Sequence, residues 1–292
     1  MNVPIEQPRF ARPLLVAVVT ALVLPLAGLP AVAHADEIVV GELVRTRSQG
    51  DPADPVEQAT DGSASWVRTE AGETVRVAPD DVADVPVGST VEVVLGADAP
   101  DEAAAPHGLE PARTALDVTV LEAAAGGQPT AAAPGPVTNE VLVVSVLAGG
   151  ATPDPSNTTQ TYVDVVNGWV HDFWADESDG AIELNATGWP STVTTAAPCS
   201  SPYDMWDEAA AAVGFVPGPG KHLLLHVSSW GIGSWPCDYS MAELGWGPDA
   251  GGFAYVRGPG NKLIAHELGH NFGLDDSLNE QCYPSVESGD CR

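Results

Sequence analysis

Short runs of alternating apolar and polar residues occupy the first part of the chain, from Asp36 to about Leu121. They include EIVVGELV, SWVRTE, TVRVAP, STVEVVLG and ALDVTVLE, and turn residues interrupt them at short intervals. Alternation with a period of two is typical of strands that bury one face. The pattern therefore predicts a small all-β domain over residues 36–122.

The following segment, residues 123–140, is rich in Ala, Gly and Pro and has no apolar period. This composition is typical of an exposed linker. The β-rich domain before it contains no catalytic constellation, and we interpret it as a propeptide, with an ordinary accessory domain as the alternative. No cysteine precedes Cys199, which excludes a propeptide thiolate as a blocker of a metal site.

From Val141 onward, strand patterns alternate with helix patterns. VLVVSVLAG and KHLLLHVSS are continuous apolar runs, AIELNATGW is another strand candidate, and PYDMWDEAAAAVGF favours a helix. A further amphipathic helix is predicted where apolar residues recur at helical intervals, at Tyr162, Val166, Trp169, Val170 and Phe173. Alternating strands and helices call for a mostly parallel sheet with packed helices. We therefore expect an α/β domain over residues 141–292.

The N-terminus has the pattern of a secretory signal peptide. Arg9 and Arg12 precede an apolar run, and Ala33-His34-Ala35 supplies small residues for cleavage. We expect residues 1–35 to be removed and the protein to be secreted; an uncleaved anchor is the alternative. No later run is long enough to cross a membrane, so no membrane partner is expected after signal removal.

The chain is strongly acidic. Its 40 Asp and Glu residues against 11 Lys and Arg give a net charge of −29. Such a charge disfavours nucleic acid and anionic membranes as partners and favours solubility. We expect a monomer.

The four cysteines all lie in the second half of the chain. An even number in an exported protein favours two disulfides, and we pair Cys199 with Cys237 and Cys282 with Cys291. The second pair closes a short loop. A zinc site built from the four thiolates is the alternative, but the residues lack the paired short spacing of such sites.

The strongest chemical signal is the segment His266-Glu267-Leu268-Gly269-His270. Residues four apart lie on one face of a helix, so both imidazoles can bind one metal ion. The glutamate between them can take a proton from a water on that ion. The segment predicts a Zn²⁺ site with His266 and His270 as ligands and Glu267 as general base.

Two glycines in this segment call for an explanation. Gly269 costs a helix interior about 1 kcal/mol relative to alanine, so we expect another group to pack closely against it. Gly273 suits a left-handed turn that ends the helix and returns the chain across the metal. Such a turn could bring Asp276 to the ion as a third ligand, with the adjacent Asp275 as the alternative.

The extended segment resembles the metzincin pattern H-E-x-x-H-x-x-G-x-x-H, with Asp276 at the last position. The phrase HELGHNFGL looks most like gametolysin-like and reprolysin-like secreted peptidases, and the final aspartate is similar to that of snapalysin-like enzymes. The resemblance implies a metzincin-like α+β fold, a mixed and mostly parallel sheet with packed helices and an active-site helix, and zinc-dependent hydrolysis of peptide or protein substrates.

By the same resemblance, one sheet-edge strand would bind the substrate. We expect it in the segment Met241, Ala242, Glu243, Leu244, Gly245 and Trp246; a glycine-rich loop is the alternative. An open edge offers unpaired backbone groups to an extended peptide of varied sequence. His222 and His226 are also four apart, but they lie in a strand-like run, so we interpret them as core or rim residues rather than a second metal site.

Metzincins carry a methionine turn downstream of the third ligand. This sequence has only Met1, Met205 and Met241, so the resemblance implies a catalytic domain that is incomplete at its C-terminus. Three functions remain open: a secreted zinc endopeptidase made as a precursor, a secreted binding protein with a structural or degenerate metal site, and a metallohydrolase that acts on another substrate.

Overall fold

The computed structural model describes residues 37–49, 63–99, 108–124, 136–149, 151, 158–227, 237, 239–275, 282–285 and 288–291. Residues Asp36–Arg292 form one compact unit. The predicted signal peptide lies outside the described residues. Among the described helices, none is both long and apolar enough to cross a membrane.

Five strands of the N-terminal part form a closed barrel. β1 pairs with β2 and β4, β2 with β3, β3 with β5, and β4 with β5. The order β4-β1-β2-β3 is that of a Greek key. A short 3-10 helix, η2, lies between β3 and β4. The bounds are β1 Glu37–Gln49, β2 Ala64–Arg68, β3 Thr74–Val77, η2 Pro79–Val82, β4 Thr90–Asp98 and β5 Arg113–Glu122.

The barrel interior follows from the alternation in its strands. Each strand turns every second side chain inward, and the inward positions carry branched aliphatic residues. The buried cluster consists of Val39, Leu43, Val67, Val77, Val82, Val91, Val93 and Leu95. The sequence pattern of this region thus correctly predicted strands with one buried face.

The second part of the chain forms the strand order β10-β11-β9-β6-β7, with β8 beside β6. The pairings β6–β7, β6–β8, β6–β9 and β9–β11 are parallel, and β10–β11 is antiparallel. The bounds are β6 Val137–Ala148, β7 Ile182–Gly188, β8 Val193–Thr195, β9 Lys221–Val227, β10 Ser240–Glu243 and β11 Gly252–Val256.

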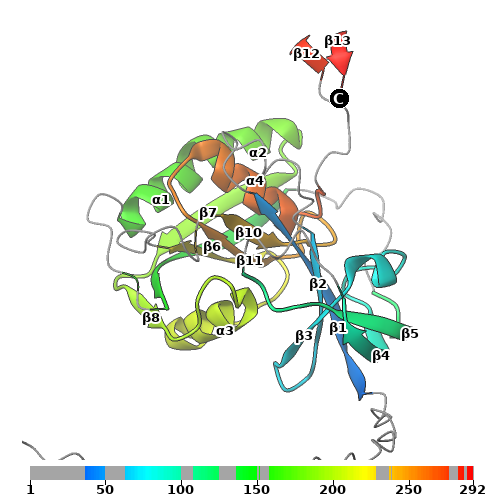
Figure 1. Cartoon of the computed structure of the whole chain (residues 1–292). Helices are drawn as coiled ribbons and strands as arrows, with labels where there is room; N and C mark the ends of the chain where they lie inside the picture. The colour runs from blue at the N-terminus through cyan, green and yellow to red at the C-terminus, as the bar shows by residue number, and fades with distance from the viewer. Residues whose placement is uncertain are drawn as a thin grey trace, which may run out of the picture. The chain divides into compact units, whose positions relative to one another are not determined.

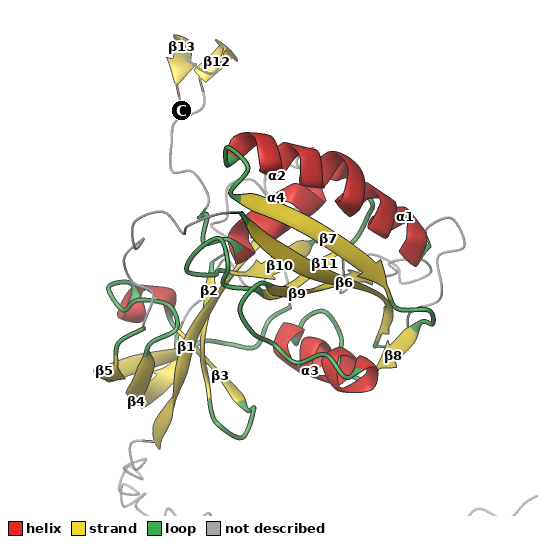
Figure 2. Ribbon diagram, turned by 180° about the vertical axis from the view of Figure 1, so that it is seen from behind, coloured by secondary structure: helices red, strands yellow, loops and turns green. Residues whose placement is uncertain are grey.

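Helices cover both faces of this part of the sheet. Figure 2 shows α1, α2 and α4 on one side and α3 on the other. A π-helical turn, η4, joins α1 to α2, with Gly168 in a non-helical conformation, so the predicted amphipathic helix is present but interrupted. The bounds are α1 Thr159–Val165, η4 Val166–Val170, α2 His171–Glu177, α3 Pro202–Val213 and α4 Asn261–Asn271.

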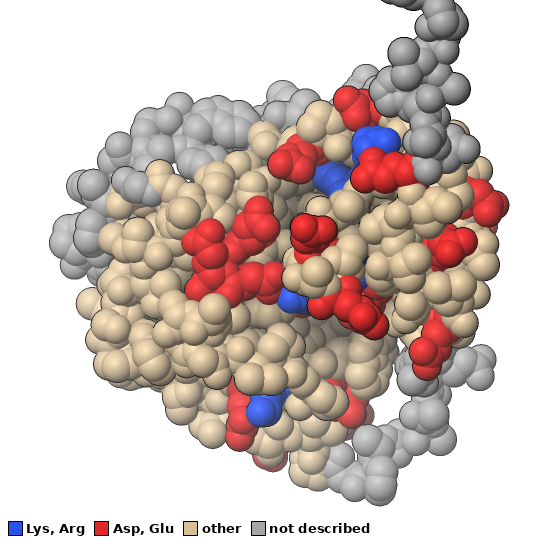
Figure 3. All heavy atoms as spheres, turned by 90° about the horizontal axis from the view of Figure 1, so that it is seen from below, with Lys and Arg blue, Asp and Glu red and all other residues tan. Residues whose placement is uncertain are grey.

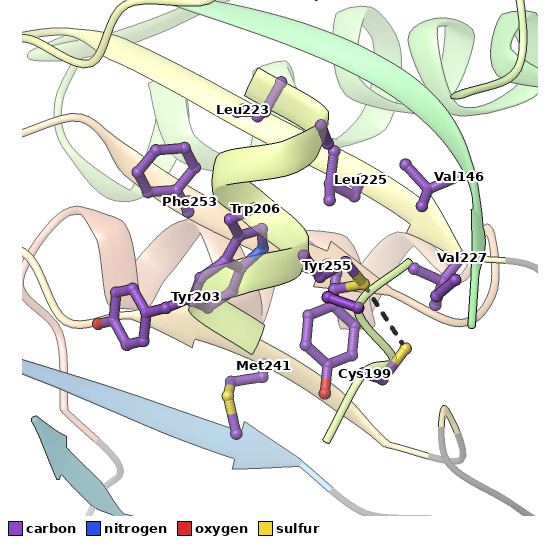
Figure 4. Packing of buried hydrophobic residues seen from close by; sticks show 14 of the residues in the cluster. Val146, Cys199, Tyr203, Trp206, Leu223, Leu225, Val227, Met241, Phe253 and Tyr255 are labelled. Carbon is purple, nitrogen blue, oxygen red and sulfur yellow. Dashed lines mark hydrogen bonds between the residues drawn. The ribbon is translucent and has the colours of Figure 1, made fainter. Parts of the chain in front are cut away.

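Strand alternation divides the core between the two faces. Leu223 and Leu225 of β9 pack on the α3 side, whereas Leu224 packs on the side of α1, α2 and α4. On the α3 side, Trp206 lies among Tyr203, Phe253 and Tyr255 (Figure 4). The Cys199–Cys237 disulfide belongs to this core, as predicted.

The second predicted cysteine pair lies in a separate two-stranded hairpin. β12 (Cys282–Ser285) pairs with β13 (Ser288–Cys291), and the register sets Cys282 opposite Cys291. The backbone thus places the two predicted partners at facing positions. The side chains of this hairpin lie outside the described residues.

β1 connects the barrel to the rest of the sheet. Its C-terminal end, Thr46–Gln49, pairs antiparallel with β10, so the strands from both parts of the chain make one eleven-stranded sheet. In Figure 1, β1 runs from the barrel toward β10. Its side chains also serve two cores, because Leu43 points into the barrel and Val44 packs with the cluster on the α3 side.

The predicted fold class is therefore wrong. The described chain is strand-rich, with a closed five-stranded barrel and many further strands, and not the mostly parallel, metzincin-like α/β sheet with packed helices that we expected. Six strand pairings of the large sheet are antiparallel and five are parallel. Periodicity identifies a strand, but it contains no information on which distant strand will pair with it.

Candidate metal site on helix α4

Helix α4 presents its two histidines to a common point. The Nε2 atoms of His266 and His270 lie 2.9 Å apart. Two nitrogens on one tetrahedral Zn²⁺, each about 2.0–2.1 Å from the ion, are separated by roughly 3.3 Å. A small ring rotation would therefore bring both atoms into bonding range of one ion, and the pair fits the predicted role.

The second ring nitrogen of His270 fixes the form of the imidazole. Nδ1 of His270 lies 2.7 Å from the carbonyl oxygen of Leu274. Because a carbonyl only accepts, Nδ1 carries the hydrogen and donates it, and a neutral ring then offers the lone pair of Nε2. Metal-binding histidines are commonly held in this way by a backbone carbonyl.

The close packing at Gly269 and the left-handed conformation of Gly273 are confirmed. A Cβ on Gly269 would come within 2.9 Å of the indole ring of Trp174 in α2, so the glycine allows α2 and α4 to approach closely. Gly273 has φ +89°, in the left-handed region that favours glycine. It ends the helix and turns the chain so that the Leu274 carbonyl reaches His270.

The candidate third ligands, Asp275 and Asp276, follow Gly273 in the sequence. Asp276 falls outside the described residues, and among the described ones no group of three His, Cys, Asp or Glu side chains is arranged to hold a metal. Asp275 is exposed and binds Arg47 of β1, with Nε 2.5 Å from Oδ1 and Nη2 2.7 Å from Oδ2. In this structure the Asp275 carboxylate is therefore engaged in an ion pair with Arg47.

Glu267 lies between the two histidines in the sequence, and its side chain is completely buried. Its charge acts on Tyr255 of β11. The pKa of that phenol is raised well above its ordinary value, first by burial, then by Tyr239 and by the charge of Glu267. The carboxylate thus lies on the inner side of α4, next to the sheet.

The predicted substrate-binding segment is a strand at its beginning and a loop at its end. Ser240–Glu243 form β10, which contains Met241 and Ala242, but its outer edge is paired with β1 rather than open. The expectation of an open edge is therefore wrong for this structure. The pairing partner comes from the far end of the sequence, where nothing in the local pattern indicated it.

The remaining residues of this segment pack against α4. The amide of Gly245 donates to the carbonyl of His270 at 2.8 Å, and a Cβ on Gly245 would collide with the backbone oxygen of Asn271. Glu243, Leu244, Gly245 and Trp246 also border a hollow of about 170 Å³ that Arg45 and Arg68 line from the barrel side. Burial raises the pKa of Glu243 to about 7, partly offset by Arg68.

Asn271 and His222 hold α4 on the sheet, and the motif did not point to either. The Asn271 amide donates to the carbonyls of Glu243 and Phe253 at 2.9 and 3.1 Å, which ties α4 to β10 and β11. Its Oδ1 lies 3.2 Å from Nδ1 of His222, whose Nε2 lies 3.0 Å from Oδ1 of Asn139. The sequence offered one indication of this role, since His222 is a polar residue within the apolar run KHLLLHV.

His222 and His226 are both buried in β9, as expected for core histidines. His226 stacks on Tyr162, with ring centroids 4.2 Å apart. Burial lowers the pKa of His222 to about 4, and the hydrogen bond with Asn271 opposes this shift.

This shift predicts a dependence of stability on pH. Between about pH 6.5 and 4 the unfolded chain binds a proton at His222 that the folded chain does not, so stability falls as the pH falls through this range. The effect is at most about 3 kcal/mol. Between pH 7 and pH 4.5, urea unfolding should show a smaller decrease in the free energy of unfolding for His222→Gln than for wild type, because glutamine does not titrate. An equal loss would contradict the assignment.

Among the charged side chains on the face shown in Figure 3, acidic ones prevail over Lys and Arg. This agrees with the net charge of −29. No protein-family model matches this chain, and no curated protein matches it. The candidate site rests on its own residues and geometry.

Proposed function

We propose that this protein is a secreted zinc-dependent endopeptidase made as a precursor, with a site of the kind found in the metzincin peptidases that its HELGH segment resembles. The observation that carries the proposal is the convergence of the His266 and His270 Nε2 atoms, 2.9 Å apart. The Nδ1 bond of His270 to the Leu274 carbonyl supports it, because it leaves Nε2 as a lone-pair donor.

In this proposal His266, His270 and Asp276 would hold the zinc. A bound zinc ion polarises a carbonyl and acidifies a water. Glu267 accepts the proton of the attacking water and delivers it to the leaving amine. Asn271 and the Gly245 amide keep the histidine-bearing end of α4 at a fixed distance from β10.

Secretion is part of the proposal. The N-terminal pattern of residues 1–35 supports it, and so does the Cys199–Cys237 disulfide, because disulfides persist in oxidising compartments. The substrate would be a peptide or protein; nucleic acid and membrane partners do not suit the acidic chain, and we propose a monomer.

A second candidate function is a secreted binding protein with a structural or degenerate metal site. The specific observation in its favour is the pairing of β1 along β10, which covers the edge of β10 that the peptidase function would use for a substrate. The two functions differ in whether Glu267 is needed.

The proposal is tested by metal content and by chelation. The purified full-length protein should contain one zinc per chain by elemental analysis, and His270→Ala should lose it. Cleavage of an unfolded protein substrate by the processed protein should stop with a zinc chelator and return with added zinc. Chelator-resistant cleavage, or wild-type protein without stoichiometric zinc, would reject the function.

A further inference from the structure

β10 pairs with β11 along one edge, and β1 of the same chain pairs with its other edge. The C-terminal end of β1 runs antiparallel to β10 with the register Thr46↔Glu243, Arg47↔Ala242, Ser48↔Met241 and Gln49↔Ser240. The Leu244 amide donates to the Arg45 carbonyl at 2.8 Å. Alternation along an antiparallel pair then puts the next hydrogen-bonded pair at Arg47 and Ala242.

This arrangement is that of an extended peptide added to a sheet edge. Peptides bound in this way gain affinity from main-chain hydrogen bonds to the edge strand. The endopeptidase proposed above would hold its substrate antiparallel to β10. β1 therefore occupies the place and the direction that a substrate would need.

A side-chain contact ties β1 to the end of the metal-binding helix. The Arg47 guanidinium binds the Asp275 carboxylate through two nitrogens, 2.5 and 2.7 Å from its oxygens. Asp275 directly follows Leu274, whose carbonyl orients the His270 ring. Two-point contacts of this kind between arginine and a carboxylate are stronger and more directional than single ones.

We propose that the C-terminal end of β1, Thr46–Gln49, is a built-in inhibitor that covers the substrate edge of β10 and is locked there by the Arg47–Asp275 ion pair. This inference rests on the proposed peptidase function and adds its regulation. Inhibition of this kind acts on the substrate-binding strand, so it requires no propeptide side chain on the metal.

The barrel makes the inhibitor hard to remove. Thr46 lies between Ala64 of β2 and Glu243 of β10, so β1 is paired on both sides at this position. A cut between β5 and β6 would separate the chain but leave these pairings intact. Full activity therefore requires that β1 be displaced or the barrel be digested.

The test uses the full-length chain and two substitutions at one position. Arg47→Glu replaces the ion pair with repulsion against Asp275, and Arg47→Pro also removes the backbone N–H that would pair with β10. Arg113→Ala is the matched control, since Arg113 binds Glu37 on the barrel at 3.2 Å and lies on β5, which does not pair with β10. Hydrogen exchange of the β10 amides, zinc content and cleavage rate are measured on each protein.

We expect both Arg47 variants to raise the exchange of β10 amides and the rate of substrate cleavage together, by about tenfold for Arg47→Glu. Zinc content should stay the same, and Arg113→Ala should behave like wild type. A synthetic peptide with the sequence of residues 44–49 should slow cleavage by the Arg47→Glu variant, whereas the same peptide with its residues scrambled should not.

Two outcomes would overturn the inference. One is a wild-type protein that already cleaves as fast as the variants while its β10 amides remain protected. The other is a variant that exposes β10, keeps its zinc and gains no activity. Failure of the peptidase function itself would look different, because zinc or chelator-sensitive cleavage would then be absent from every variant.

Discussion

The Glu267→Gln variant is expected to lose between about a hundredfold and ten-thousandfold in turnover while it keeps its zinc. The amide has nearly the shape of the carboxylate but cannot accept the proton of the attacking water, and general base catalysis is worth about this much. Glu267 is the only Asp or Glu in α4, so no other carboxylate on that helix could replace it. Turnover of an unfolded protein substrate in the Arg47→Glu background, together with zinc content, measures the effect.

Glu177→Gln, on the exposed side of α2, is the matched control and should leave turnover unchanged. If Glu267→Gln retained full turnover with bound zinc, the carboxylate would have no catalytic role. If instead a physiological binding activity survived in Glu267→Gln while no cleavage was detected in any form, the binding-protein function would be favoured.

The largest expected effect on stability comes from Trp206→Ala. Trp206 is completely buried on α3, with ring centroids 5.2 Å from Tyr203, 5.8 Å from Phe253 and 6.0 Å from Tyr255. Figure 4 shows the indole between α3 and the strands of the sheet. Removal of a large aromatic side chain from such a site costs about 3–5 kcal/mol of unfolding free energy, since the cavity closes only in part.

Urea unfolding followed by tryptophan-independent circular dichroism should show a lower midpoint with an unchanged slope. Trp246→Ala is the control: this side chain is 47% exposed, and its loss should change stability by no more than about 0.5 kcal/mol. A loss below about 1.5 kcal/mol for Trp206→Ala would mean that α3 contributes little to the core.

Local patterns in the sequence predicted individual elements well. The apolar runs before Ala148 and at Leu223–Leu225 are strands β6 and β9, and the segment that begins at Pro202 is helix α3. Each of these depends on periodicity and turn residues within one short window. The requirement for glycine at 269 and 273 was predicted in the same way, because each reflects a contact or turn of the helix that carries it.

Features that join distant segments could not be predicted. The β1–β10 pairing, the Arg47–Asp275 ion pair and the hydrogen bonds between His222 and Asn271 link residues far apart in the chain. Periodicity shows that β1 is a strand with one buried face, but an exposed strand edge can pair with any other. The fold-class prediction was wrong for the same reason: it assigned each half of the chain its own sheet, whereas β1 continues from one half into the other.

The shared strand also bears on how the protein is made. During synthesis the barrel strands leave the ribosome long before β10 does, so β1 can serve as a ready template on which β10 assembles. A chain expressed without the barrel would instead present β10 with a bare row of amides and carbonyls, the kind of surface through which strands of different molecules associate. Production of soluble material should therefore begin from a chain that includes the barrel.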